Sequence, residues 1–109
     1  MGKFVITKRK NGEFQFNLQA RNGEIILTSE GYTTSLGCRL GIMSVREHSS
    51  EIANFHNWDA DNGEFYFTLN ADNGEPIGVS QMYDTAQGRA KGIQSVMENG
   101  QFDQVEDLT

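Results

Sequence analysis

The sequence predicts an α+β fold built from two tandem repeats, each in the order strand, strand, strand, helix. Three observations lead to this prediction. The chain of 109 residues duplicates itself, apolar and polar residues alternate with period two within each repeat, and the apolar period becomes helical towards the end of each repeat. A repeat of about 50 residues buries too little surface to be stable alone, so we expect the two copies to share one core.

The duplication relates residues 11–48 to residues 62–99 without a gap, at a constant offset of 51 residues. Twenty of the 38 paired positions are identical. We therefore divide one pseudo-symmetric domain, residues 1–109, into repeat one (about 1–50) and repeat two (about 51–109).

The strands follow from alternation and from turn residues. Residues 14–20 and 65–71 alternate apolar and polar side chains, as half-buried antiparallel strands do. Asn-Gly pairs flank both segments, and Asn-Gly is the strongest short hairpin signal because it tolerates positive φ. Each repeat is therefore expected to contain a meander of three strands.

A helix is expected from Thr34 to His48, with its copy in repeat two. Candidate N-caps are Thr33 or Thr34 in repeat one and Asp84 or Thr85 in repeat two. After the second helix, Asn99-Gly100 forms a turn, and the segment 102–108 can add a last strand.

The length of the first turn decides which side chains face the core. A two-residue turn at Asn62-Gly63 would pair Trp58 with Phe67 and bury the indole, whereas a three-residue loop (61–63) pairs Trp58 with Tyr66 and leaves it outside. We favour the three-residue loop because it gathers the apolar residues on one face. The expected pairs are Phe4/Leu18, Ile6/Phe16, Ile26/Leu18, Phe55/Leu69, Ile77/Leu69 and Val79/Phe67.

Charge argues against a nucleic-acid partner. The formal net charge is -6, and the only basic run is 8–10, so we do not expect a general binder of phosphate backbones. Residues 1–50 carry 7 basic and 4 acidic side chains, whereas residues 51–109 carry 2 and 11. The basic run is then either a solvated hairpin tip or a site of attraction for acidic surfaces.

Composition also argues against several other classes of protein. No apolar run reaches the roughly 20 residues of a membrane span, and the first residues lack the layout of a secretion signal, so we expect a cytoplasmic protein. Cys38 alone allows no internal disulfide. His48 and His56 stand at no metal-ligand spacing, and no serine lies in a nucleophile-elbow motif. We expect no metal, no cofactor and no catalytic residue.

Two groups of residues are candidate binding surfaces. The first is the leucine face: Leu36, Leu40 and Met43. These residues lie on the side of the first helix opposite its core stripe, where the second helix carries polar residues. The leucine face either binds a partner or is covered by the C-terminal segment or a tilted helix.

The second group is the aromatic face: His56, Trp58 and Tyr66. Trp58 and Tyr66 replace Thr7 and Gln15 of repeat one on the polar side of the sheet. They either hold a peptide or a small ring by stacking, or form a cross-strand pair that only stabilises the sheet. The glycines within the two helices (37, 41, 88 and 92) indicate close packing against the sheet or the sister helix.

The repeated motifs Asn-Gly-Glu-Phe-x-Phe-x-Leu-x-Ala, Ser-x-x-Tyr-x-Thr and Gly-Ile-x-Ser-Val resemble the YegP-like proteins over nearly the whole chain. The resemblance implies two β-β-β-α units that share one antiparallel sheet, with the helices on one side, and it leaves open whether terminal strands are exchanged between the repeats. Single-repeat members of such a family are expected to pair into homodimers, so this tandem chain is expected to be a monomer. The resemblance implies no activity and no ligand.

The sequence therefore predicts a non-enzymatic module that binds a protein or a peptide. The alternative is a small-molecule-binding protein, or a weak enzyme, with a pocket between the repeats.

Overall fold

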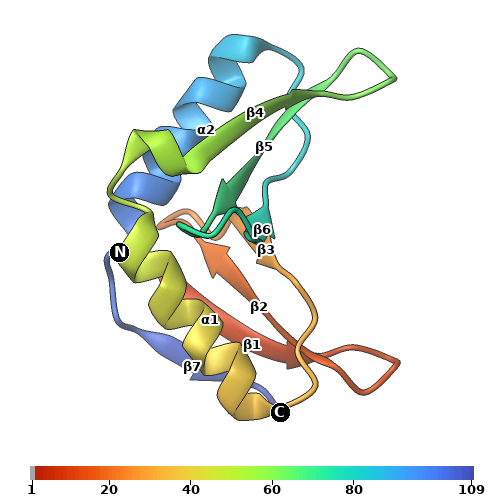
Figure 1. Cartoon of the computed structure of the whole chain (residues 1–109), viewed down its shortest axis with the longest axis vertical. Coiled ribbons are helices and arrows are strands. Elements are labelled where there is room, and N and C mark those ends of the chain that lie inside the picture. Colours follow the sequence, from red (N-terminus) through yellow and green to blue (C-terminus); the bar gives the residue numbers. More distant parts are fainter. Residues whose placement is uncertain (1) are drawn as a thin grey trace.

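The computed structural model describes residues 2–109 as one seven-stranded sheet with both helices on the same side (Figure 1). Repeat one contains β1 (Lys3–Lys8), β2 (Phe14–Gln19), β3 (Ile25–Ser29) and α1 (Ser35–His48). Repeat two contains a 3₁₀ turn, η1 (Ile52–Asn54), then β4 (Phe55–Asp59), β5 (Phe65–Asn70), β6 (Pro76–Val79), α2 (Ala86–Asn99) and β7 (Val105–Asp107). The predicted α+β fold of two β-β-β-α repeats is confirmed.

The two repeats share the sheet, whose strand order is β4-β5-β6-β3-β2-β1-β7. They join where β3 pairs antiparallel with β6, with Thr28 opposite Val79. The last strand, β7, leaves repeat two and pairs parallel with β1 at the edge of repeat one. The C-terminal strand is therefore exchanged onto the other repeat, and it is the one parallel strand among the described residues.

The first hairpin of each repeat has the three-residue loop that we favoured. Arg9 N donates to Glu13 O at 2.7 Å, and Ala60 N donates to Glu64 O at 2.8 Å, so three residues remain in each loop. The loop glycines, 12 and 63, have φ of 88° and 86°, the left-handed region that favours glycine. Trp58 consequently stands opposite Tyr66.

The register that we predicted for the second hairpin of each repeat is wrong by one residue. Leu18 pairs with Leu27 rather than Ile26, and the strands shift register between Leu18 and Gln19. Repeat two shows the same shift, with Leu69 opposite Gly78 rather than Ile77 and with Val79 opposite Thr68 rather than Phe67. The cause is a bulge, which places one extra residue in β3 and in β6.

One hydrophobic core takes residues from both repeats, because each helix contacts strands of its own repeat and of the other. Thr34 and Thr85 are the N-caps, and each Oγ1 accepts a hydrogen bond at 2.9 Å from the backbone N–H three residues later. The largest fully buried side chains include Phe4, Phe16, Phe67, Ile6, Leu18 and Leu69. No helix within residues 2–109 is long and apolar enough to cross a membrane.

The glycines at the centre of each helix make room for a tyrosine. A Cβ atom at Gly41 would lie 2.7 Å from Tyr32 Cζ, and one at Gly92 would lie 2.5 Å from Tyr83 Cζ. The two tyrosine rings stack on Phe16 and Phe67, at centroid distances of 6.4 and 6.3 Å. The close packing that we predicted is therefore present, but its partner is a tyrosine of the same repeat rather than the sister helix.

Candidate functional site

The leucine face is exposed on α1. Leu36, Leu40 and Met43 are 68 %, 54 % and 57 % exposed. The C-terminal segment lies beside α1 (Figure 1) but does not cover these three side chains. At the corresponding positions α2 carries polar residues, Gln87, Lys91 and Gln94. Three large apolar side chains therefore stand in solvent on a helix whose copy has none there.

The aromatic face lies on the opposite side of the sheet from the helices. His56 stands opposite Thr68, next to the Trp58–Tyr66 pair, so the register brings the three residues of this face together. Trp58 is 47 % exposed, and its Nε1 donates a hydrogen bond to Thr68 Oγ1 at 3.0 Å. The indole N–H thus has a partner within the sheet, which supports a stabilising role for Trp58 as much as a binding role.

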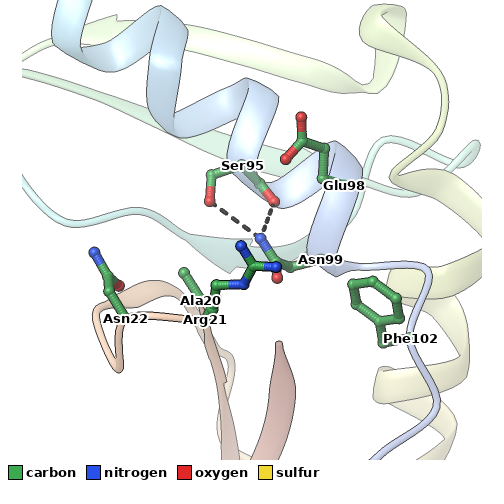
Figure 2. A pocket seen from close by; sticks show the side chains of 7 residues that line it. All are labelled: Ala20, Arg21, Asn22, Ser95, Glu98, Asn99 and Phe102. Carbon is green, nitrogen blue, oxygen red and sulfur yellow. Dashed lines mark hydrogen bonds between the residues drawn. The ribbon is translucent and has the colours of Figure 1, made fainter. Parts of the chain in front are cut away.

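Two clefts lie between the repeats at pseudo-equivalent places. The first cleft, of about 430 Å³, opens between the turn that joins β2 to β3 and the last turns of α2 (Figure 2). Its lining residues are Ala20, Arg21, Asn22, Ser95, Glu98, Asn99 and Phe102. The second cleft, also about 430 Å³, lies between α1 and the turn that joins β5 to β6. The first cleft carries both charges, from Arg21 and Glu98, whereas the second is lined by Glu30 and Glu75.

The structure also brings together a serine, a histidine and an aspartate that our sequence reasoning did not connect. His48 Nδ1 lies 3.3 Å from Ser44 Oγ and 2.8 Å from Ser44 O, and His48 Nε2 lies 3.6 Å from Asp72 Oδ1. The position equivalent to His48 is Asn99, whose Nδ2 donates to Ser95 O at 2.8 Å and to Ser95 Oγ at 3.3 Å.

The distances from His48 to Ser44 match those from Asn99 to Ser95, and this match identifies the role of His48. Asn99 donates through an N–H group, so we assign the proton of His48 to Nδ1, which donates to Ser44 O in the same way. A protonated Nδ1 cannot accept the proton of the Ser44 hydroxyl, and a nucleophilic serine needs a base that can. The arrangement therefore holds the last turn of α1 and does not form a hydrolase triad.

The single cysteine is buried. Cys38 lies in the core, and burial raises the pKa of its thiol above the ordinary value. A thiol with a raised pKa is protonated at neutral pH, and only the thiolate is a good nucleophile. Cys38 therefore serves as a small apolar side chain on the core side of α1.

Comparison with known proteins agrees with the fold. The profile of a family described as "Domain of unknown function (DUF1508)" matches residues 10–54 and again residues 60–107. The UPF0339 protein YegP of Escherichia coli K12 is 47 % identical over 108 residues, which cover 99 % of this chain and 98 % of that protein. A UPF0339 protein of Shewanella oneidensis is 45 % identical over 108 residues, with 99 % and 98 % coverage.

Two solved structures resemble this one closely. The solution structure of E. coli YegP, described as a protein of unknown function, superposes with a TM-score of 0.94; the alignment covers 99 % of this chain and 93 % of that chain. The solution structure of the UPF0339 protein SO3888 from S. oneidensis gives 0.93, with 45 % identity and coverage of 99 % and 92 %. The predicted resemblance is confirmed: the chain belongs to the DUF1508 family, with two copies of the domain, and is a relative of the UPF0339 protein YegP.

Proposed function

We propose that this protein is a non-enzymatic interaction module that binds a protein or peptide partner through the leucine face of α1. The observation that supports the proposal is the exposure of Leu36, Leu40 and Met43 where the otherwise similar α2 is polar. Contiguous exposed apolar side chains mark interaction sites more often than single ones do. A monomer is expected, because both halves of the core lie in one chain.

The aromatic face is the weaker surface for this role. Its indole N–H is already paired with Thr68, and a cross-strand aromatic pair stabilises a sheet by roughly 0.2–1 kcal/mol without any ligand. Trp58→Ala therefore serves as the comparison that separates the two surfaces.

The test compares three variants in affinity capture from the native lysate: Leu40→Glu, Trp58→Ala and Lys91→Glu. Lys91 occupies the position on α2 that corresponds to Leu40, so Lys91→Glu is the matched control for a new carboxylate on a helix surface. Each variant is first shown to be folded by NMR. We expect one partner to be captured by the wild type, the control and Trp58→Ala, and to be lost with Leu40→Glu, since an unpaired buried carboxylate lowers affinity tenfold or more.

Three other results would contradict the proposal. If Leu40→Glu does not fold, the leucine face belongs to the core. If capture depends on Trp58 instead, the aromatic face is the binding surface. If no variant changes the captured set, the interaction proposal fails.

The first cleft supports a second candidate, a protein that binds a small molecule between the repeats. Its walls place the guanidinium of Arg21 and the carboxylate of Glu98 around an open volume of about 430 Å³ (Figure 2). A metabolite screen by thermal shift tests this candidate, because a ligand that binds only the folded state raises the melting temperature. A hit should be lost with Arg21→Ala and kept with Leu40→Glu.

A further inference from the structure

The C-terminal segment of this chain docks beside α1 as an extended strand. Phe4 N donates to Gln104 O at 2.9 Å, and Leu108 N donates to Ile6 O at 3.0 Å. Between these bonds Val105 packs against the hydrophobic core. Repeat one therefore already holds one extended segment next to the leucine face.

This docked segment is acidic, and repeat one supplies the matching cations. Glu106 forms an ion pair with Lys3 at 3.0 Å, and Asp107 forms one with Arg39 at 2.9 Å. Hydrogen bonds from the side chain and backbone of Thr109 lower the pKa of Asp107, with a smaller contribution from Arg39, so Asp107 is charged at neutral pH. At the positions of repeat two that correspond to Lys3, Arg39 and Arg46 the residues are uncharged: Asn54, Ala90 and Met97.

One of these cations keeps unused donors. Arg46 Nε donates to Phe102 O at 3.0 Å, and its guanidinium lies 5.7 Å from the centre of the Phe4 ring. Within residues 2–109 its two terminal nitrogens make no hydrogen bond or ion pair, although an arginine offers a fork of donors that suits a carboxylate. A hollow of about 320 Å³ lies beside it, lined by Arg39, Ile42, Met43, Arg46 and Val105.

The hollow continues the leucine face, since Met43 belongs to both. An apolar floor bordered by Arg46, beside the Arg39–Asp107 ion pair, fits a segment that carries apolar and acidic side chains together. Glu47, exposed on the next turn of α1, would repel a carboxylate at the far end of the leucine face. Acidic groups are therefore favoured on the side of the helix that faces β7.

Building on the proposed function, we infer that the partner of the leucine face is an acidic segment, whose apolar side chains cover Leu36, Leu40 and Met43 and whose carboxylate binds Arg46 at the hollow. Charge complementarity with Arg46 supports this occupant, and β7 is the internal example of such a segment, held by the neighbouring cations Lys3 and Arg39. A basic segment would meet the guanidinium of Arg46, which pairs with no carboxylate of the described residues, and gain only the apolar contacts.

The test uses two synthetic amphipathic peptides of equal length with leucines at the same positions. All other positions are glutamate in one peptide and lysine in the other. Each is titrated into the full chain at low salt, and backbone amide shifts report the site and the affinity. We expect the glutamate peptide to bind about tenfold or more tightly than the lysine peptide, with shifts in α1 and β7, and to weaken as salt is added.

Variants assign the contact. Arg46→Gln should weaken the glutamate peptide about tenfold, whereas Lys91→Gln, which removes an exposed positive charge from α2, should leave its affinity unchanged. Because Arg46 also contacts Phe4, Arg46→Lys is the second variant. It keeps the charge but lacks the fork of donors, so it should weaken the glutamate peptide less than Arg46→Gln, and both variants must show native amide spectra.

The outcomes separate this inference from the proposed function. If both peptides bind α1 equally, the leucine face is a binding surface but its partner is not acidic. If the glutamate peptide shifts amides elsewhere, or does not bind, the inference is wrong, and the capture experiment with Leu40→Glu decides the proposed function separately. If the chain self-associates through the same amides, the occupant is a second copy.

Discussion

Substitution of Gly41 by alanine tests the tyrosine packing that joins each helix to its sheet. The new methyl group would lie 2.7 Å from Tyr32 Cζ and 3.0 Å from Phe16 Cε2, and these two rings stack on each other, so neither can retreat easily. Overpacking costs about 1–3 kcal/mol, and we take the upper end here. Alanine in a helix interior returns about 1 kcal/mol relative to glycine. We therefore expect Gly41→Ala to lower the free energy of unfolding by about 2 kcal/mol.

The matched control is Gly37→Ala in the same helix. Its methyl group would lie 3.1 Å from Thr34 Oγ1 and 3.6 Å from Tyr32 Cδ1, so the stability should stay within about 1 kcal/mol of the wild type. Urea unfolding measures both variants, and Gly41→Ala should shift the midpoint down by about 1 M at an unchanged slope. Equal midpoints for the two variants would refute the reasoning. Tyr32→Phe, which removes the hydroxyl nearest to the new methyl group, should partly restore Gly41→Ala.

Three further predictions concern polar side chains that are buried or partly buried. Ser29→Ala removes the Oγ that accepts a hydrogen bond from the buried Phe16 N–H at 2.8 Å, so the free energy of unfolding should fall by about 1–3 kcal/mol. Urea unfolding measures this loss, and an unchanged midpoint would contradict the prediction. His48→Asn introduces the residue found at the corresponding position of α2, so the melting temperature should stay within about 4 °C of the wild-type value. A larger fall in melting temperature would show that the imidazole has another role. Burial raises the pKa of Tyr32 and of Tyr83 above 10.0, so the folded state keeps these protons to higher pH than the unfolded chain does. The stability that this shift contributes is complete below pH 10.0 and falls as pH rises further. In melting experiments at alkaline pH, a double variant with phenylalanine at both positions should therefore lose less stability than the wild type.

The sequence predicted the parts of the fold that depend on local pattern. Alternation placed the strands, and the glycine of each first turn predicted the loop and the Trp58–Tyr66 pair. It did not predict the bulge opposite Leu18, because Ile26 and Leu27 are both apolar and either can face the core. Only the packing of the whole sheet decides between two adjacent apolar residues.

Candidate sites were predictable where the repeats differ, and harder to predict where they agree. The polar counterparts on α2 indicated that Leu36, Leu40 and Met43 are exposed. The hydrogen bonds of His48 were missed, although Ser44 and Ser95 recur at the same place, each four residues before His48 or Asn99. That spacing, one helical turn, was the available signal. Local sequence patterns could not predict that β7 pairs with β1, because the two strands lie about 100 residues apart in the sequence.

The position of β7 also orders events during synthesis. A ribosome releases repeat one, and then repeat two, before residues 105–107 become available to pair with β1. Until then the outer edge of β1 has no neighbouring strand, and an open strand edge is a template for pairing with other chains. The nascent protein consequently keeps this open strand edge until nearly all of its core residues have been made, and only the pairing of residues 105–107 with β1 closes it.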